Sequence, residues 1–238
     1  MTTDKKSKSH QIKNEVKKLE EEVSRGLKKE IRRWPALLAF LAIGGIYMVL
    51  SERLVFGPGW LLLPIILALV IPALILRRQG KHRLNHYILL MLCFLITLAE
   101  VISISLLLLS LPDKTIPATT LLGNAGLLWG TNILVFALWY WQLEAGGPNE
   151  RVREPADIYH QRSELFFPQL TMLQMRPEMA HWRPGFIDYL FVAFNTSTAF
   201  SPTDTPVLSS RIKVLSMVQS VLSLVTVATL AARAVNMF

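Results

Sequence analysis

The chain has almost no cysteine and little charge outside its first segment. A single cysteine, Cys93, occurs in 238 residues, so no disulfide can form within the chain and no cysteine-based metal site can be built. Charged residues make up 18%, against about 25% in a typical soluble domain, and hydrophobic residues make up 52%. These proportions exclude an ordinary soluble domain, and the apolar content excludes a disordered protein.

The sequence also lacks the usual enzyme motifs. It has no phosphate-binding glycine loop, no nucleophile elbow and no HExxH metal motif, so we expect neither an enzyme nor a cofactor. His82 and His86 are four residues apart in a basic turn, which favours titratable side chains at a membrane interface over a metal site. A charged segment precedes the first apolar run, which therefore predicts a retained membrane span and no signal peptide.

Residues 1–34 carry 11 Lys or Arg and 6 Asp or Glu, and their apolar residues recur every three or four positions. This pattern predicts a basic amphipathic helix on the cytoplasmic side. A short coiled coil and a helix lying on anionic membrane lipid remain open as alternatives. Acids dilute the positive charge and no aromatic residues interleave with it, so no nucleic-acid partner is expected.

Four apolar segments follow, at residues 35–50, 60–76, 87–111 and 119–143. A bilayer core needs about 20 apolar residues in helical form, so the last two segments are long enough and the first two are short. We expect residues 35–118 to form a three-span bundle. In the fourth segment, Asn124 and Asn132 share one helix face, which favours hydrogen bonds between helices.

The remainder of the chain predicts a membrane segment that enters and leaves on one side. Residues 144–184 form a proline-rich loop after the outer helix 119–143. A short helix at 185–200 then leads into a run rich in hydroxyl groups and stops before Pro202, too soon to cross a membrane comfortably. An inner helix at 206–236 follows. Irregular backbone at membrane depth is tolerated only where it lines a cavity or is buried in protein.

This order of outer helix, loop, short helix, threonine-rich strand, aspartate and inner helix resembles the two-helix pore unit of potassium channels over residues 119–238. Residues 194–204, with the sequence FNTSTAFSPTD, are similar to the end of the pore helix and the selectivity strand. Four further segments resemble an uncharacterised family of bacterial membrane proteins whose members are often described as channel-like: residues 136–148, 182–189, 199–206 and 231–236.

The resemblance implies a tetramer that passes small cations, because one chain supplies one pore loop. The residues implied for the ion path are Asn195, Thr196, Ser197, Thr198, Thr203 and Asp204. A standard potassium filter is not expected, because carbonyl filters use glycines with positive φ. No glycine follows Gly185, and Pro202 cannot adopt that conformation.

Glu100 lies in the middle of the third apolar segment. A charge at that depth costs at least about 2.5–3.5 kcal/mol, so intramembrane acids face the bundle interior and are candidates for function. Two interpretations have equal weight. In the first, Glu100 tunes ion passage by its protonation or carries a proton; in the second, it is a protonated side chain hydrogen-bonded to a neighbour.

The positions of Lys and Arg predict the orientation. The tail, the turn at 77–86 and the loop at 144–184 are the most basic connecting segments, which places them in the cytoplasm by the positive-inside rule. This assignment conflicts with potassium channels, whose pore loop faces outside.

The sequence therefore predicts an all-α integral membrane protein of the bacterial inner membrane, a helical bundle with five spans plus a re-entrant pore-like helix. Its expected function is weakly selective cation conduction. A non-conducting membrane scaffold or regulatory protein and a proton-coupled transporter using Glu100 are the alternatives.

Overall fold

The computed structural model describes residues 33–113, 116–153, 159, 161–171, 182–202 and 204–235. Within these residues the chain is helical, and its only β-type pairing is an isolated bridge between Leu165 and Val207. The expectation of an all-helical protein is confirmed for this part. The amphipathic helix expected within residues 1–34 lies almost entirely outside it.

Four helices are long and apolar enough to cross a membrane, which indicates a membrane protein. They are α3 (Leu62–Arg78) with the short turn η2 (Gly59–Leu61) before it, α4 (His82–Ser110), α5 (Ala118–Leu143) and α10 (Ser210–Val235). A shorter apolar helix, α2 (Trp34–Val49), precedes them. Its 16 residues span about 24 Å at 1.5 Å per residue, less than the roughly 30 Å hydrocarbon core.

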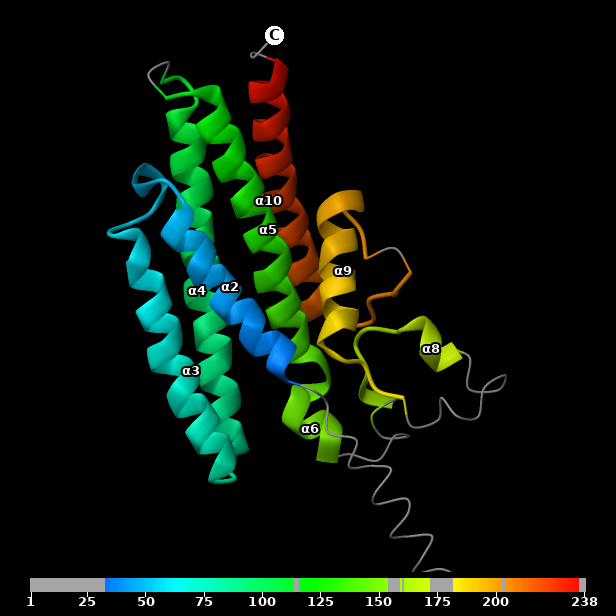
Figure 1. Cartoon of the computed structure of the whole chain (residues 1–238). Helices are drawn as coiled ribbons and strands as arrows, with labels where there is room; N and C mark the ends of the chain where they lie inside the picture. Colours follow the sequence, from blue (N-terminus) through cyan, green and yellow to red (C-terminus); the bar gives the residue numbers. More distant parts are fainter. Residues whose placement is uncertain are drawn as a thin grey trace, which may run out of the picture.

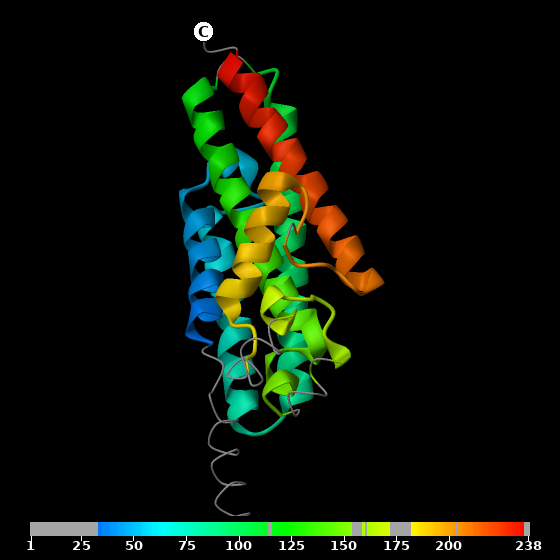
Figure 2. The same ribbon diagram turned by 90° about the vertical axis from the view of Figure 1, so that its right-hand side faces the viewer.

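Helices α2, α3, α4 and α5 run alternately up and down, and α5 lies at the centre of the bundle (Figures 1 and 2). It packs against α2, α4, α9 (Phe186–Ala199) and α10. Much of its length is therefore buried within the protein, whereas α3 and α10 expose a large apolar surface. Exposed side chains such as Ile71 and Val221 suit contact with lipid.

Basic residues gather where α2 begins, α3 ends and α4 begins. We call this region, with Arg33, Arg77, Arg78, Lys81 and Arg83, the basic end. The end of α5, the turn η3 (Glu144–Gly146) and the short helices α6 (Pro148–Arg153) and α8 (Pro168–Thr171) lie at the same end. The opposite end carries the turn η1 (Glu52–Leu54) and the end of α10 (Figure 1).

Helices α2 and α3 approach closely at Gly44. A Cβ atom added there would lie 2.6 Å from Leu63 Cδ1 and 3.3 Å from Leu63 Cα, whereas one added at the neighbouring Gly45 would meet nothing within 4 Å. Only a residue without a side chain fits the first position without movement of α3.

We expect Gly44→Leu to destabilise the protein by overpacking, at a cost of about 1–3 kcal/mol. Gly45→Leu is the matched control and should be neutral or slightly stabilising, because leucine favours helix more than glycine does. Thermal unfolding of the two variants in detergent measures the difference. Equal losses in both variants would contradict the close packing of α2 on α3.

Candidate functional site

Helix α9 begins beside the end of α5, lies on an outer side of the bundle and stops partway along it (Figure 2). Near its start, the ring of Phe186 contacts that of Trp141 with a centroid separation of 6.0 Å. Near its other end, Ser197 Oγ donates a hydrogen bond of 2.9 Å to Asn132 Oδ1. Asn132 and Trp141 are about 13 Å apart along the α5 axis at 1.5 Å per residue, so α9 reaches only part of the way along α5.

The start of α9 is closed by its own acid. Asp188 Oδ2 accepts a hydrogen bond of 2.7 Å from the backbone N–H of Gly185, as expected for an acid in the first turn of a helix. At the other end, Phe200 adopts a left-handed conformation with φ 56°, which ends the helix and turns the chain back.

The chain after α9 returns to the side from which α9 came. Residues 206–208 pair with residues 164–166 through two backbone hydrogen bonds: Leu208 N–H donates to Glu164 O at 2.8 Å, and Phe166 N–H donates to Pro206 O at 2.9 Å. Arg211, at the start of α10, donates to both carboxyl oxygens of Glu164 and to Leu143 O. Helices α9 and α10 therefore both start next to the end of α5.

A buried ion pair holds this junction together. Glu144 Oε2 lies 3.9 Å from Arg151 Nη1, and neither side chain has any exposed surface. The backbone between them turns sharply, with positive φ at Ala145, Gly146 and Gly147. A Cβ atom at Gly147 would come within 2.9 Å of Gln142 O, so this position needs glycine for space as well as for conformation.

Both members of the ion pair have further partners. The Arg151 guanidinium donates to Glu144 O and Trp141 O, and it lies 4.7 Å from the Trp141 ring centroid and 5.1 Å from that of Tyr189. Glu144 Oε1 accepts hydrogen bonds from Ser163 Oγ and from the backbone N–H of Glu164. One ion pair thus connects α5, α6, α9 and the segment before α8.

Sequence reasoning did not single out this pair. The available signal was an acid followed by Gly146 and Gly147, with an arginine one short helix later, and this pattern does not identify partners.

The residues implied for an ion path do not share one surface. Thr196 and Ser197 are buried, Asn195 is partly buried, and Thr198 and Asp204 are exposed. Thr196 and Thr198 donate to backbone carbonyls one turn earlier in α9. Thr203 lies outside the described residues.

Ser197 belongs to a buried polar chain that crosses three helices. Tyr140 OH donates to Gln219 Oε1 at 2.6 Å, and Gln219 Nε2 donates to Ser197 Oγ at 2.9 Å. The Ser197 hydroxyl then donates to Asn132 Oδ1, so the donor direction runs from α5 through α10 and α9 back to α5. The hydrogen bond between helices expected for Asn132 is confirmed. Asn124 Oδ1 instead accepts from the backbone N–H of Ser51, in the turn after α2, at 3.4 Å.

The polar chain ends next to Glu100 of α4. The side-chain amide of Asn132 lies near the Glu100 carboxyl group. No hydrogen bond of acceptable geometry joins them, and within the described part of the chain neither Glu100 oxygen has a hydrogen-bond partner. Glu100 is also fully buried. Hydrogen-bonded side chains lie about one turn away on either side along α4: Ser103 Oγ donates to Tyr47 OH of α2 at 3.4 Å, and Thr97 Oγ1 accepts from Trp139 Nε1 of α5 at 2.8 Å.

Among the described residues, no three His, Cys, Asp or Glu side chains gather closely enough to hold a metal ion. His82 and His86 instead line a polar pocket at the basic end, together with Arg83, Glu150 and Arg162.

Comparison with known proteins finds no matching family, no matching curated protein and no matching solved structure. The fold and its polar groups are therefore the basis for a functional proposal.

We expect Arg151→Met to lower the thermal stability strongly, because Glu144 would be left as an uncompensated buried charge. Breaking such a pair from one side typically costs about 3–5 kcal/mol. The matched control is Arg53→Met, which removes an exposed partner of Asp113 and should cost at most about 1 kcal/mol. Thermal unfolding in detergent compares them. Losses of equal size would show that the buried pair does not anchor the junction.

Proposed function

We propose that the chain is one protomer of an oligomeric membrane channel of the pore-loop type that passes small cations with weak selectivity. The observation that carries this proposal is the course of residues 186–210. Helix α9 extends from the end of α5 along the outer side of the bundle and stops about halfway along α5. The chain then returns to the end of α5 before α10 runs along the length of α5. This is the arrangement of a re-entrant pore segment.

In the proposed topology α2, α3, α4, α5 and α10 are five spans and α9 is the re-entrant helix. Helix α2 is short for a span, with 16 residues. The positive-inside rule places the basic end in the cytoplasm. The re-entrant segment then opens on the cytoplasmic side, the reverse of a potassium channel, and the end of α10 lies outside.

A single re-entrant segment cannot enclose a pore, so several copies have to meet around an axis. The outer faces of α9 and α10 offer exposed apolar side chains for that contact, among them Phe191 and Met217. Thr198 and Asp204 are exposed in the protomer and are the residues we assign to the path. Thr196 and Ser197 act in packing instead, because neighbouring groups within the protomer already satisfy them.

The proposed conduction is weakly selective for a physical reason. A ring of threonine hydroxyls and aspartates attracts cations without replacing a defined hydration shell. The return segment has no glycine that would allow a row of carbonyl groups to face an axis.

Two measurements on the detergent-extracted protein test the channel proposal together. Native mass spectrometry should show a tetramer, and Asp204→Asn should reduce cation flux through proteoliposomes severalfold by removing negative charge from the path. The control is Glu52→Gln, which removes an exposed carboxylate at the opposite end and should leave the flux unchanged.

A stable monomer or dimer, or a wild-type protein that passes no ions, would contradict conduction and favour the scaffold alternative. An unchanged flux in Asp204→Asn, with the tetramer intact, would remove Asp204 from the path.

A second candidate function is proton-coupled transport through Glu100. The observation that favours it is the burial of this acid: Glu100 has no exposed surface, and neither of its oxygens accepts a hydrogen bond of good geometry among the described residues. A structural acid at that depth would normally have a partner, because an unsatisfied buried polar group is costly. The adjoining polar chain through Asn132 connects it to the re-entrant helix.

We expect Glu100→Gln to abolish any dependence of transport on a pH gradient, because glutamine keeps the size of the side chain and loses the titratable proton. Flux into proteoliposomes, measured with and without an imposed pH gradient, distinguishes the candidates. Ser103→Ala is the control, since it removes a polar group one turn away without changing Glu100. A pH-driven flux that survives Glu100→Gln would exclude the transporter mechanism.

A further inference from the structure

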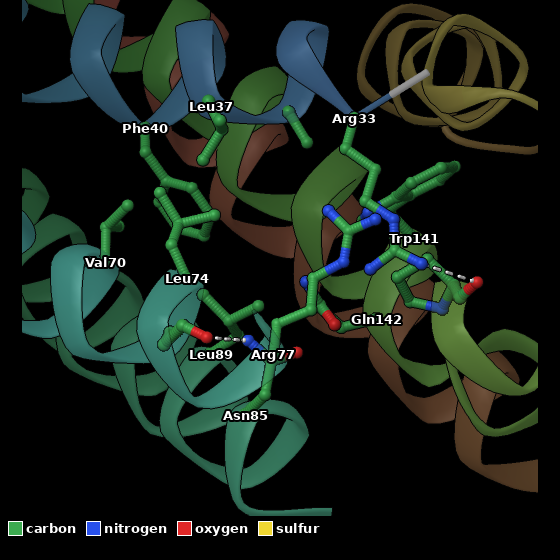
Figure 3. A pocket seen from close by; sticks show the side chains of 13 residues that line it. Arg33, Leu37, Phe40, Val70, Leu74, Arg77, Asn85, Leu89, Trp141 and Gln142 are labelled. Atoms are coloured by element: carbon green, nitrogen blue, oxygen red, sulfur yellow. Dashed lines mark hydrogen bonds between the residues drawn. The ribbon is translucent and has the colours of Figure 1, made fainter. Parts of the chain in front are cut away.

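Helices α2, α3 and α4 enclose a space near each of their ends. The space at the basic end, which also borders α5, measures about 40 Å³ and has room for only a few water molecules (Figure 3). Part of its wall is already hydrogen-bonded, since Asn85 Nδ2 donates to Ala73 O at 2.7 Å and Asn85 Oδ1 accepts from Asn149 Nδ2 at 3.1 Å. This space is too small for a ligand.

The space at the opposite end is larger. It measures about 220 Å³ and lies among α2, α3, α4 and the segment between η1 and η2. We call it the Tyr47 cavity, after a residue of α2 that lines it. An apolar cavity of about 150 Å³ is enough to bind benzene. The Tyr47 cavity therefore has room for one ring with a substituent, and not for a whole lipid molecule.

Most of the wall of the Tyr47 cavity is apolar. It is formed by side chains from α3 and α4, among them Leu62, Ile65, Leu95, Ala99 and Ile102. Leu61 of η2 and Leu98 of α4 also line the cavity and are exposed, so the cavity reaches the outer surface of the bundle there. Since this surface is apolar and suits contact with lipid, a molecule that enters the cavity comes from the membrane.

Two hydroxyl groups form the polar part of the wall. Tyr47 and Ser103 line the cavity, and each residue is 1% exposed. Ser103 Oγ donates to Tyr47 OH at 3.4 Å. Among the described residues, the Tyr47 hydroxyl donates to no group in turn, and the Glu100 carboxyl group, one turn before Ser103, does not accept from it. Because a buried tyrosine hydroxyl usually has a hydrogen-bond partner, one donor in this wall is left for a ligand.

A single donor in an apolar wall selects for a particular chemistry. A hydrocarbon would fill the space but would leave the Tyr47 hydroxyl without an acceptor, which costs free energy. A carbonyl group accepts that hydrogen bond and brings no donor of its own that the wall would have to satisfy. No charged side chain is among the described residues that line the cavity, so a charged ligand would lose its hydration without gaining a partner.

We propose that the Tyr47 cavity binds the carbonyl-bearing ring of a neutral, membrane-soluble ketone or quinone, with the carbonyl oxygen accepting a hydrogen bond from Tyr47 OH. The ring lies against Ile65 and Ala99, and an attached alkyl chain leaves into the lipid between Leu61 and Leu98. The proposal needs the protein to lie in a membrane, but it does not depend on whether the protein conducts ions or carries protons.

The test uses two fluorinated probes of the same shape on the full-length protein in lipid nanodiscs. 4-Fluoroacetophenone has the carbonyl group, and in 4-fluoro-α-methylstyrene a methylene group replaces its oxygen. Fluorine NMR measures binding, with probe concentrations counted in the membrane phase and empty nanodiscs as background. The wild-type protein should bind the ketone about tenfold more tightly, the effect of one hydrogen bond from a buried donor. Tyr47→Phe should remove this preference, whereas Tyr87→Phe, an exposed tyrosine outside the cavity, should keep it.

A second pair of variants tests the location of the bound probe without changing a polar group. Ala99→Phe would fill the cavity and abolish binding of both probes, whereas Ala68→Phe, on the exposed face of α3, would not. The proposal is wrong if the wild-type protein binds both probes equally, if Tyr47→Phe keeps the preference for the ketone, or if Ala99→Phe still binds it. Equal binding that Ala99→Phe abolishes would instead assign the cavity to an apolar chain such as the end of an acyl tail.

Discussion

Glu144 and Arg151 meet without exposed surface where α5 ends, and the arrangement of α6, α9 and the segment before α8 depends on their contact. A buried ion pair adds little net stability, because desolvation offsets most of the attraction. Its effect is to make other arrangements of α6 and α5 costly, because moving α6 away would leave a charge buried without its partner. The same arginine contacts the Trp141 and Tyr189 rings, so the position of α9 is fixed by the same group.

The far end of α9 faces a different constraint. A helix that stops among other helices leaves backbone carbonyls without partners, and no water is present in a bilayer core to satisfy them. Side chains of α10 supply the missing partners: Ser223 Oγ donates to Ser197 O at 2.7 Å, and Gln219 Nε2 donates to Ala193 O at 2.8 Å. The hydroxyl and amide groups of α10 therefore make it possible for α9 to end where it does.

The helices could be predicted from the sequence because their signals are local. Apolar runs gave the long helices within a few residues, although the third segment begins earlier than expected, at His82, because its first polar turn is also helical. Prolines and an acid in the first turn located α9. Asn132 could be assigned to contact between helices, since polar side chains inside a span seek such partners.

The identity of the partners was not predictable. Glu144 and Arg151 lie where the chain has no periodic pattern, so neither their burial nor their pairing has a sequence signal. Ser197 was assigned to an ion path from the resemblance to a channel pore segment, yet its hydroxyl is bonded to Gln219, which is distant in sequence. A periodic pattern identifies the face of a helix, and only the packing of other helices determines whether that face meets water, lipid or protein.

In the proposed five-span topology, the length of α2 has a consequence for the membrane itself. At about 24 Å it is shorter than the hydrocarbon core, while α4 and α5 beside it are longer than that core. Hydrophobic mismatch of this kind is relieved by thinning of the bilayer, at a modest cost per ångström. The protein would then carry a thinned rim of lipid along α2 and a thicker one along the opposite side. In that topology, the lipid beside α2 would carry shorter acyl chains than the lipid on the opposite side.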